Sequence, residues 1–175
     1  MTAETTNRPK RPRAKAGDIL RIDLGDGKYA MAQVLIAKIS LYLVVFDRVV
    51  DVDFSPARIG ELGPLLIGET TSVLVRSGDW AVVGKSPVPA DYPRPYAVVN
   101  NASGLVVHDF DRNVVREASA KDARFYGYRC SASSQAVVAE ARACLGLDPP
   151  QEGFEYLRFE NVKRRSRPTP DAPSV

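Results

Sequence analysis

The stretch VVHDFDRN comes closer than any other in this sequence to an acid–base or metal-binding group. It contains the one histidine of the chain, His108, together with Asp109 and Asp111. Imidazole and carboxylate groups can exchange protons or bind a metal ion, so this trio supports a hydrolase hypothesis. Residues 104–109 are typical of a strand, however, in which neighbouring side chains point to opposite faces. We therefore expect a structural role for His108 and Asp109, with no catalytic residue, metal or cofactor.

Other catalytic motifs are missing from the sequence. It contains no G-x-S-x-G nucleophile elbow, no P-loop and no dinucleotide fingerprint. Cys130 and Cys144 are too far apart for a C-x-x-C motif and too few for a disulfide framework. We expect both thiols to be reduced, and the sequence does not predict an enzyme.

Aspartates recur at predicted strand ends and turns, and they form a second group of candidate residues. Many such carboxylates only stabilise turns. On one surface, however, they would complement a basic partner and raise its rate of association. We predict a partner-binding surface formed by Asp18, Asp23, Asp26, Asp47, Asp51 and Asp53.

The segment LGDGKYAMAQV predicts a hairpin rather than a phosphate-binding loop. A phosphate loop would open a helix, but the residues after Gly27 alternate in the manner of a strand. Asp26 and Gly27 supply the positive φ angles that a tight hairpin turn requires. We expect strands near residues 18–24, 28–38, 41–50, 71–76, 79–84, 95–101, 104–109 and 153–160, with a further short strand at residues 112–117.

The connections and the helix complete the expected fold. Residues 53–69 contain prolines and glycines that indicate an irregular connection, and the proline-rich residues 84–96 should run extended between two halves of the sheet. Residues 133–145 repeat apolar residues at helical spacing between a serine cap and Gly146. Together these elements predict an α+β protein with a mostly antiparallel sheet or partly open barrel and one packed C-terminal helix.

Charge divides the chain into a body and two tails. The 175 residues carry a net charge of +3, with +4 on residues 1–16, +3 on residues 163–175 and therefore −4 on residues 17–162. The tails have few bulky apolar residues, so we expect disordered basic tails around a single β-rich domain. No signal peptide or membrane span is evident, which favours the cytoplasm.

Three segments resemble the immunity protein 26 family of bacterial polymorphic-toxin systems. They are GDILRIDLGDGKYAMAQVL, LYLVVFD and DWAVVGKSPVP, and they lie within residues 17–88. The positions that match the motif include Gly17, Asp26, Gly27, Tyr29, Gln33, Trp80, Gly84 and Lys85. The resemblance implies a mainly β, non-catalytic protein that neutralises a toxin, although some relatives carry a phosphotriesterase name.

Three functional hypotheses follow. The first is an immunity-type protein that blocks a cognate toxin by occlusion. The second is a small phosphotriester hydrolase that uses the His108 trio. The third is a nucleic-acid-associated protein that binds through its basic tails, because clustered Lys and Arg displace counterions from phosphates.

Overall fold

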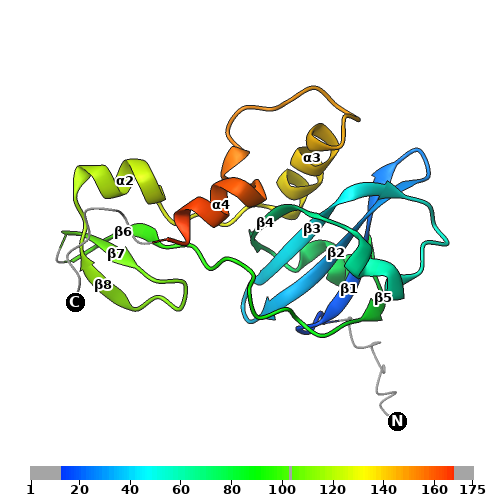
Figure 1. The fold of residues 1–175 in the computed structure, drawn as a ribbon, viewed down its shortest axis with the longest axis horizontal. Coiled ribbons are helices and arrows are strands. Elements are labelled where there is room, and N and C mark those ends of the chain that lie inside the picture. The colour runs from blue at the N-terminus through cyan, green and yellow to red at the C-terminus, as the bar shows by residue number, and fades with distance from the viewer. Residues whose placement is uncertain (1–12, 103, 168–175) are drawn as a thin grey trace, which may run out of the picture.

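Two separate antiparallel sheets organise the α+β fold (Figure 1). The computed structural model describes residues 13–102 and 104–167. The strands are β1 (Asp18–Gly25), β2 (Lys28–Ala37), β3 (Leu41–Val50), β4 (Pro64–Thr70), β5 (Trp80–Lys85), β6 (Ala97–Asn101), β7 (Gly104–His108) and β8 (Val114–Glu117). The helices are α1 (Val73–Ser77), α2 (Ala120–Tyr126), α3 (Ser134–Cys144) and α4 (Phe159–Arg165), with 3-10 helices η1 (Pro56–Glu61) and η2 (Glu155–Leu157).

The larger sheet has the strand order β4-β3-β2-β1-β5, and every neighbouring pair is antiparallel. β4 and β5 are its two edges, so the sheet is open rather than a closed barrel. The predicted hairpin is confirmed, because β1 and β2 pair up to Gly25 and Lys28. At its tip Asp26 and Gly27 have φ angles of 53° and 69°, in the left-handed region that Asp and Gly tolerate best.

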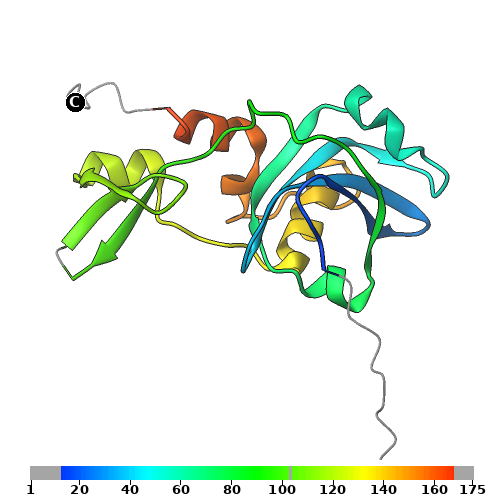
Figure 2. The ribbon, with the colours of Figure 1, turned by 90° about the horizontal axis from the view of Figure 1, so that it is seen from below.

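Both faces of the larger sheet are covered, so its central strands lack polar alternation. Six successive residues are buried in β2 and six in β3. On one face Leu43 and Trp80 share a core with Val137 of α3, and on the other Val44 shares a core with Val162 of α4. Figure 2 shows α3 against this sheet and well separated from α2. Near-continuous apolar runs of this kind are typical of strands buried on both sides.

The smaller sheet consists of β6, β7 and β8 and is covered by α2. Val98, Val107 and Tyr126 form its core. The proline-rich residues 86–96 thus connect two distinct sheets, not two halves of one sheet as we expected. In the chain, the smaller sheet is inserted between β5 and α3.

Two predicted strands are wrong. Residues 71–76 are mostly helical, because α1 begins at Val73 and ends before Gly78, whose φ angle is 95°. The strand lies earlier, in β4, where Leu66 and Ile67 are buried against β3. Pro64 and the glycines of residues 60–68 concealed this strand, since such residues usually mark connections.

The predicted strand at residues 153–160 is also wrong, because this segment forms η2 and the start of α4. Its backbone pairing with the larger sheet is limited, within the described residues, to an isolated bridge between Leu66 and Arg158, and side chains such as Leu157 pack against the sheet. α4 continues to Arg165, so the expected tail boundary after residue 162 falls inside a helix. Residues 1–12 and 168–175, which hold most of both expected tails, lie outside the described residues.

The helix expected at residues 133–145 is confirmed as α3, and the Ser133 side chain caps its first turn. The sequence did not reveal α2, which is short and depends on a capping box between Ser119 and Asp122. No helix in the described residues is long and apolar enough to cross a membrane.

Candidate functional site

The structure gives each carboxylate of the His108 trio a local partner. Asp109 accepts hydrogen bonds from the backbone and side-chain nitrogens of Asn113, both at 2.8 Å, and these bonds lower the pKa of its carboxyl group. Asp111 lies 3.9 Å from the ammonium group of Lys38. The buried Nε2 of His108 has no hydrogen-bond partner among the described residues. Asp109 thus stabilises the turn between β7 and β8, and the described residues contain no group of three potential metal ligands.

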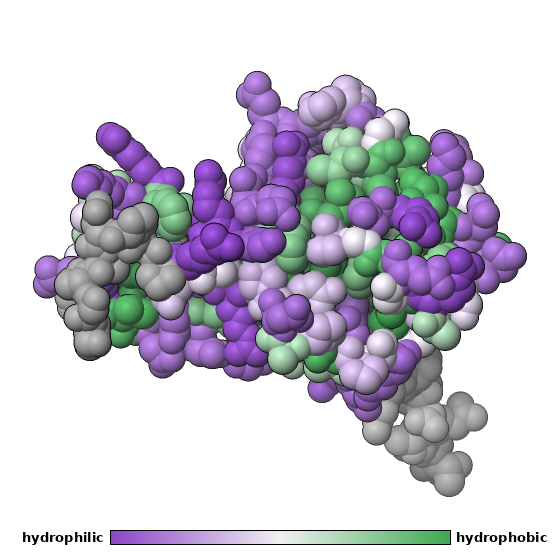
Figure 3. Space-filling view, viewed as in Figure 1, coloured by the Kyte–Doolittle hydropathy of each residue, from purple (hydrophilic) through white to green (hydrophobic). Residues whose placement is uncertain are grey.

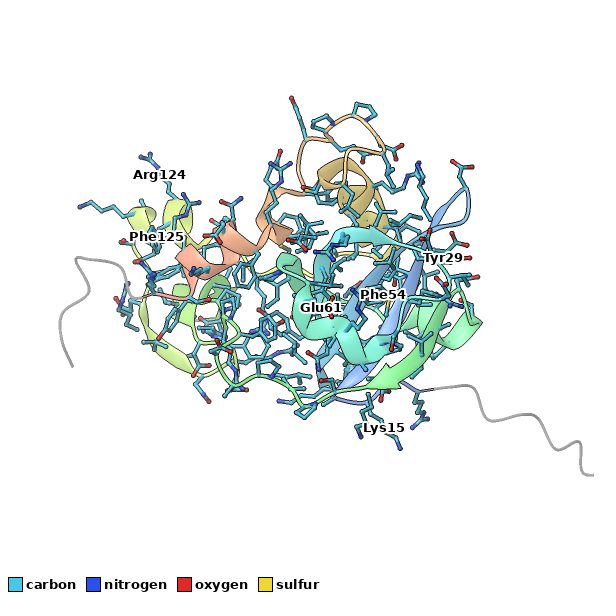
Figure 4. The ribbon with its side chains drawn as sticks, turned by 45° about the vertical axis from the view of Figure 1, so that its right-hand side comes forward. Lys15, Tyr29, Phe54, Glu61, Arg124 and Phe125 are labelled. Atoms are coloured by element: carbon cyan, nitrogen blue, oxygen red, sulfur yellow. The ribbon has the colours of Figure 1, made fainter. Side chains whose placement is uncertain are left out.

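Four of the six predicted aspartates lie at one end of the larger sheet. The register aligns Asp23 with Tyr29 and Tyr29 with Val50, so β1, β2 and β3 reach the same level there. The exposed aspartates at or beyond this level are Asp23, Asp26, Asp51 and Asp53. Figure 4 shows Tyr29 beside this end of the molecule and Arg124 of α2 at the opposite end.

A fifth aspartate, Asp79, joins this group although the sequence did not single it out. β5 begins with Trp80 opposite Ile22, so Asp79 adjoins Asp23, and both line one shallow surface hollow. We call the group Asp23, Asp26, Asp51, Asp53 and Asp79 the acidic end. Figure 3 shows hydrophilic residues along the margin of the molecule where the β1–β2 hairpin lies.

The carboxylates of the acidic end form no ion pairs in the described part of the chain, although Asp23 accepts a hydrogen bond from the Gly25 N–H at 2.7 Å and Asp79 accepts one from the Ser77 hydroxyl at 2.5 Å. No ion pair among the described residues includes any of the five aspartates. The nearby Arg21 is held instead by the backbone, since its Nη1 donates to the Val52 carbonyl at 2.7 Å and its guanidinium lies 5.0 Å from the centre of the Tyr29 ring. Arg142 lines the same hollow as Asp23 and Asp79 and interacts electrostatically with Asp26, but its ion pair, at 2.6 Å, is with Asp148. The negative charge therefore faces solvent.

Asp18 and Asp47, the other two predicted contacts, lie away from this end of the sheet and bind backbone N–H groups of nearby connections. Asp18 is buried and accepts a hydrogen bond from the Lys15 backbone N–H at 2.7 Å. Asp47 accepts one from the Gly63 N–H at 2.9 Å, which fixes the connection between β3 and β4. Neither belongs to the acidic end.

Several residues of the motif hold β2, β5, η1 and the loop after β5 together. Gln33 donates from Nε2 to the backbone carbonyls of Ser86 and Pro87, at 3.0 and 3.1 Å. Gly84 leaves no room for a side chain, because a Cβ there would lie 2.6 Å from Cβ of Pro56. Trp80 is almost wholly buried in the core. These residues support the fold, and Asp26 is the motif residue that lies on the acidic end.

A cleft between the two sheets escaped the sequence analysis altogether. Its inner part is a cavity of about 50 Å³, and a groove of about 240 Å³ adjoins it. The two parts share four lining residues, which are Tyr42, Glu69, Phe110 and Arg129. Arg165 lines the inner cavity, and burial lowers the pKa of its guanidinium group.

Helical spacing offered a signal for Arg165. Phe159, Val162 and Arg165 recur every three residues, and the first two pack against the larger sheet. Residues at this spacing share a helix face, so Arg165 should also have faced inward. We expected it in a basic tail because Lys163 and Arg164 precede it. Comparison with known proteins adds no site, since no family model, curated protein or solved structure matches this chain.

Proposed function

We propose that this protein is an immunity-type binding protein that neutralises a cognate toxin by covering part of its surface, with the acidic end as the contact. The observation that carries the proposal is the gathering of five exposed aspartates, none of them in an ion pair within the described residues, from the end of β1 and three connections at one end of the sheet. The resemblance to immunity protein 26, described above, supplies the class of partner. The proposed mechanism needs no cofactor.

The proposed contact would combine charge complementarity between the two surfaces with an apolar group at the centre of the acidic end. Exposed charges of one sign accelerate association with an oppositely charged surface and disfavour other partners. Val52, whose exposed fraction is 58%, lies between Asp51 and Asp53, and the half-buried Tyr29 ring is close by. Such apolar and aromatic groups surrounded by polar residues are typical of the side chains that dominate binding energy. A basic toxin surface would fit this end.

Co-expression with the toxin that the immunity function implies to be encoded beside this gene tests the proposal. The wild-type protein should allow the cells to survive, and deleting it should abolish survival. A variant combining Asp23→Asn, Asp51→Asn and Asp53→Asn should bind the toxin more slowly and protect less well. The matched control combines Glu117→Gln, Glu152→Gln and Glu160→Gln, which removes the same charge from exposed sites elsewhere.

The control should protect like the wild-type protein. Survival that does not depend on the protein refutes the immunity function. If the control variant loses protection as completely as the Asp variant, net charge rather than the acidic end governs binding, and this contact surface is wrong.

A further inference from the structure

The cleft between the sheets contains an arginine without a counter-ion. Arg165 donates from Nη1 to the Tyr126 carbonyl at 3.2 Å and from Nε to the Asn161 carbonyl at 3.4 Å, and its Nη2 donates to the Tyr156 carbonyl. All three acceptors are neutral. No carboxylate of the described residues lies within ion-pairing distance of Arg165. Partial burial of a guanidinium group without a counter-ion costs desolvation free energy, and a bound anion would offset this cost.

The hydrogen bonds of Arg165 leave donors for a ligand. A guanidinium group has five N–H donors, and each terminal nitrogen carries two of them. Because Nη1 and Nη2 each donate once within the described structure, each keeps one N–H. A planar group with two such donors suits the paired oxygens of a carboxylate or phosphate.

The nearby acidic residue is already neutralised. Glu69 lies 3.4 Å from Arg129 and 3.6 Å from Arg112, and Ser40 donates a hydrogen bond to its carboxylate. Glu69 therefore has two cationic partners of its own and does not serve Arg165. Together, the cavity and the groove are lined by more cationic than anionic side chains.

The size of the cavity limits the ligand. A water molecule needs roughly 10–15 Å³ of such space, so about 50 Å³ accommodates a small group of about four oxygen-sized atoms. The groove beyond it is lined by Ile36, Tyr42 and Phe110, and Ile39 at its rim is almost fully exposed. An apolar body attached to the anionic group would contact these side chains.

We propose that this cleft binds a small organic oxyanion, with its carboxylate or phosphate group on Arg165 and its apolar body in the groove against Tyr42 and Phe110. This site is distinct from the acidic end and would remain even if the proposed immunity function failed. It calls for no chemical step, because the ligand is held and not transformed.

Cys130 provides a readout that does not require the natural ligand. It is an exposed residue that lines the inner cavity, although partial burial raises the pKa of its thiol. In a Cys144→Ala background, the labelling rate of Cys130 by a neutral maleimide can be measured with benzoate, acetate or inorganic phosphate at constant ionic strength. Chloride serves as the control anion.

We expect saturable protection, with labelling slowed about tenfold at roughly ten times the dissociation constant. Stronger protection by benzoate than by acetate would place the apolar body in the groove, whereas protection by phosphate would identify a phosphate group as the head. Protection by none of the three in the folded wild-type protein would overturn the proposal.

Substitutions connect the protection to Arg165. Arg165→Gln and Arg165→Lys should each weaken protection at least about tenfold, since the first removes the charge and the second removes the paired donors. Arg164→Gln is the matched control, because this neighbouring arginine is exposed and does not line the cavity. If Arg165→Gln does not fold, the Lys variant decides the test. Wild-type protection in a folded Lys variant would overturn the role of the paired donors.

Discussion

Arg158 and Glu140 form an ion pair in which the acidic partner is fully buried. Nε of Arg158 lies 2.7 Å from Oε1 of Glu140, whose exposed fraction is 0%, and the second carboxylate oxygen has no partner among the described residues. Glu140 belongs to α3, and Arg158 lies between η2 and α4. The pair therefore joins the helix that covers the larger sheet to the C-terminal segment.

Arg158→Ala should lower the free energy of unfolding by about 3 kcal/mol, because it leaves a buried carboxylate without its counter-charge. Arg58→Ala is the control, since its pair with Glu61 is solvent-exposed, and it should destabilise the protein far less. Urea denaturation of both variants measures the difference. Equal losses of unfolding free energy would show that the buried ion pair stabilises the protein no more than the exposed pair does.

Stability should fall in acid because of Asp122. Arg116 donates two hydrogen bonds to this carboxylate, at 2.6 and 2.7 Å, and they lower its pKa in the folded protein. The unfolded chain has an ordinary Asp pKa of about 3.9, so it binds the proton first as the pH falls. The stabilisation is complete above that pH and decreases below it. Urea denaturation between about pH 7 and pH 2.5 measures the free energy of unfolding of the wild type and of Asp122→Asn, and the two values should approach each other in acid. A difference that stays constant with pH would contradict this role of Asp122.

Gly84→Ala should destabilise the protein by roughly 1–3 kcal/mol, because the added methyl group would meet the rigid ring of Pro56. Gly60→Ala is the control. A Cβ at Gly60 meets nothing within 4 Å, so its effect should stay within about 0.5 kcal/mol. Thermal denaturation compares the two variants, and a neutral Gly84→Ala would refute the close packing of β5 on η1.

The predicted aspartates should separate into two classes by stability. Asp51→Asn and Asp53→Asn should change the free energy of unfolding by less than about 0.5 kcal/mol, because these side chains are exposed and unpaired in the described structure. Asp47→Ala should cost about 1 kcal/mol through loss of its hydrogen bond to Gly63. Chemical denaturation tests all three. A large loss at position 51 or 53 would mean that the acidic end supports folding.

Local sequence signals predicted the elements that depend on near neighbours. Asp26-Gly27 and the alternation around it predicted the first hairpin, and Ser133 with Gly146 delimited α3. β4 could not be predicted in this way, because Pro64 and Gly68 resemble loop residues and its strand conformation depends on pairing with β3.

The candidate sites likewise combine features that depend on near neighbours in the sequence with features that depend on tertiary contacts. Aspartates at turns could be recognised singly, but their gathering depends on the register that aligns Asp23, Tyr29 and Val50. The partly buried state of Arg165 depends on contacts with the Tyr126 carbonyl, 39 residues earlier in the chain, and with the Tyr156 carbonyl, nine residues earlier. In sequence, Arg165 is indistinguishable by residue type from the exposed Arg164 beside it.

The insertion of the smaller sheet between β5 and α3 has a consequence for biosynthesis. All five strands of the larger sheet leave the ribosome before residues 134–144, so during translation the apolar face that α3 later covers stays open while β6 to β8 and α2 are being made. Chaperones that recognise exposed apolar surface can bind this face of the nascent chain before α3 covers it.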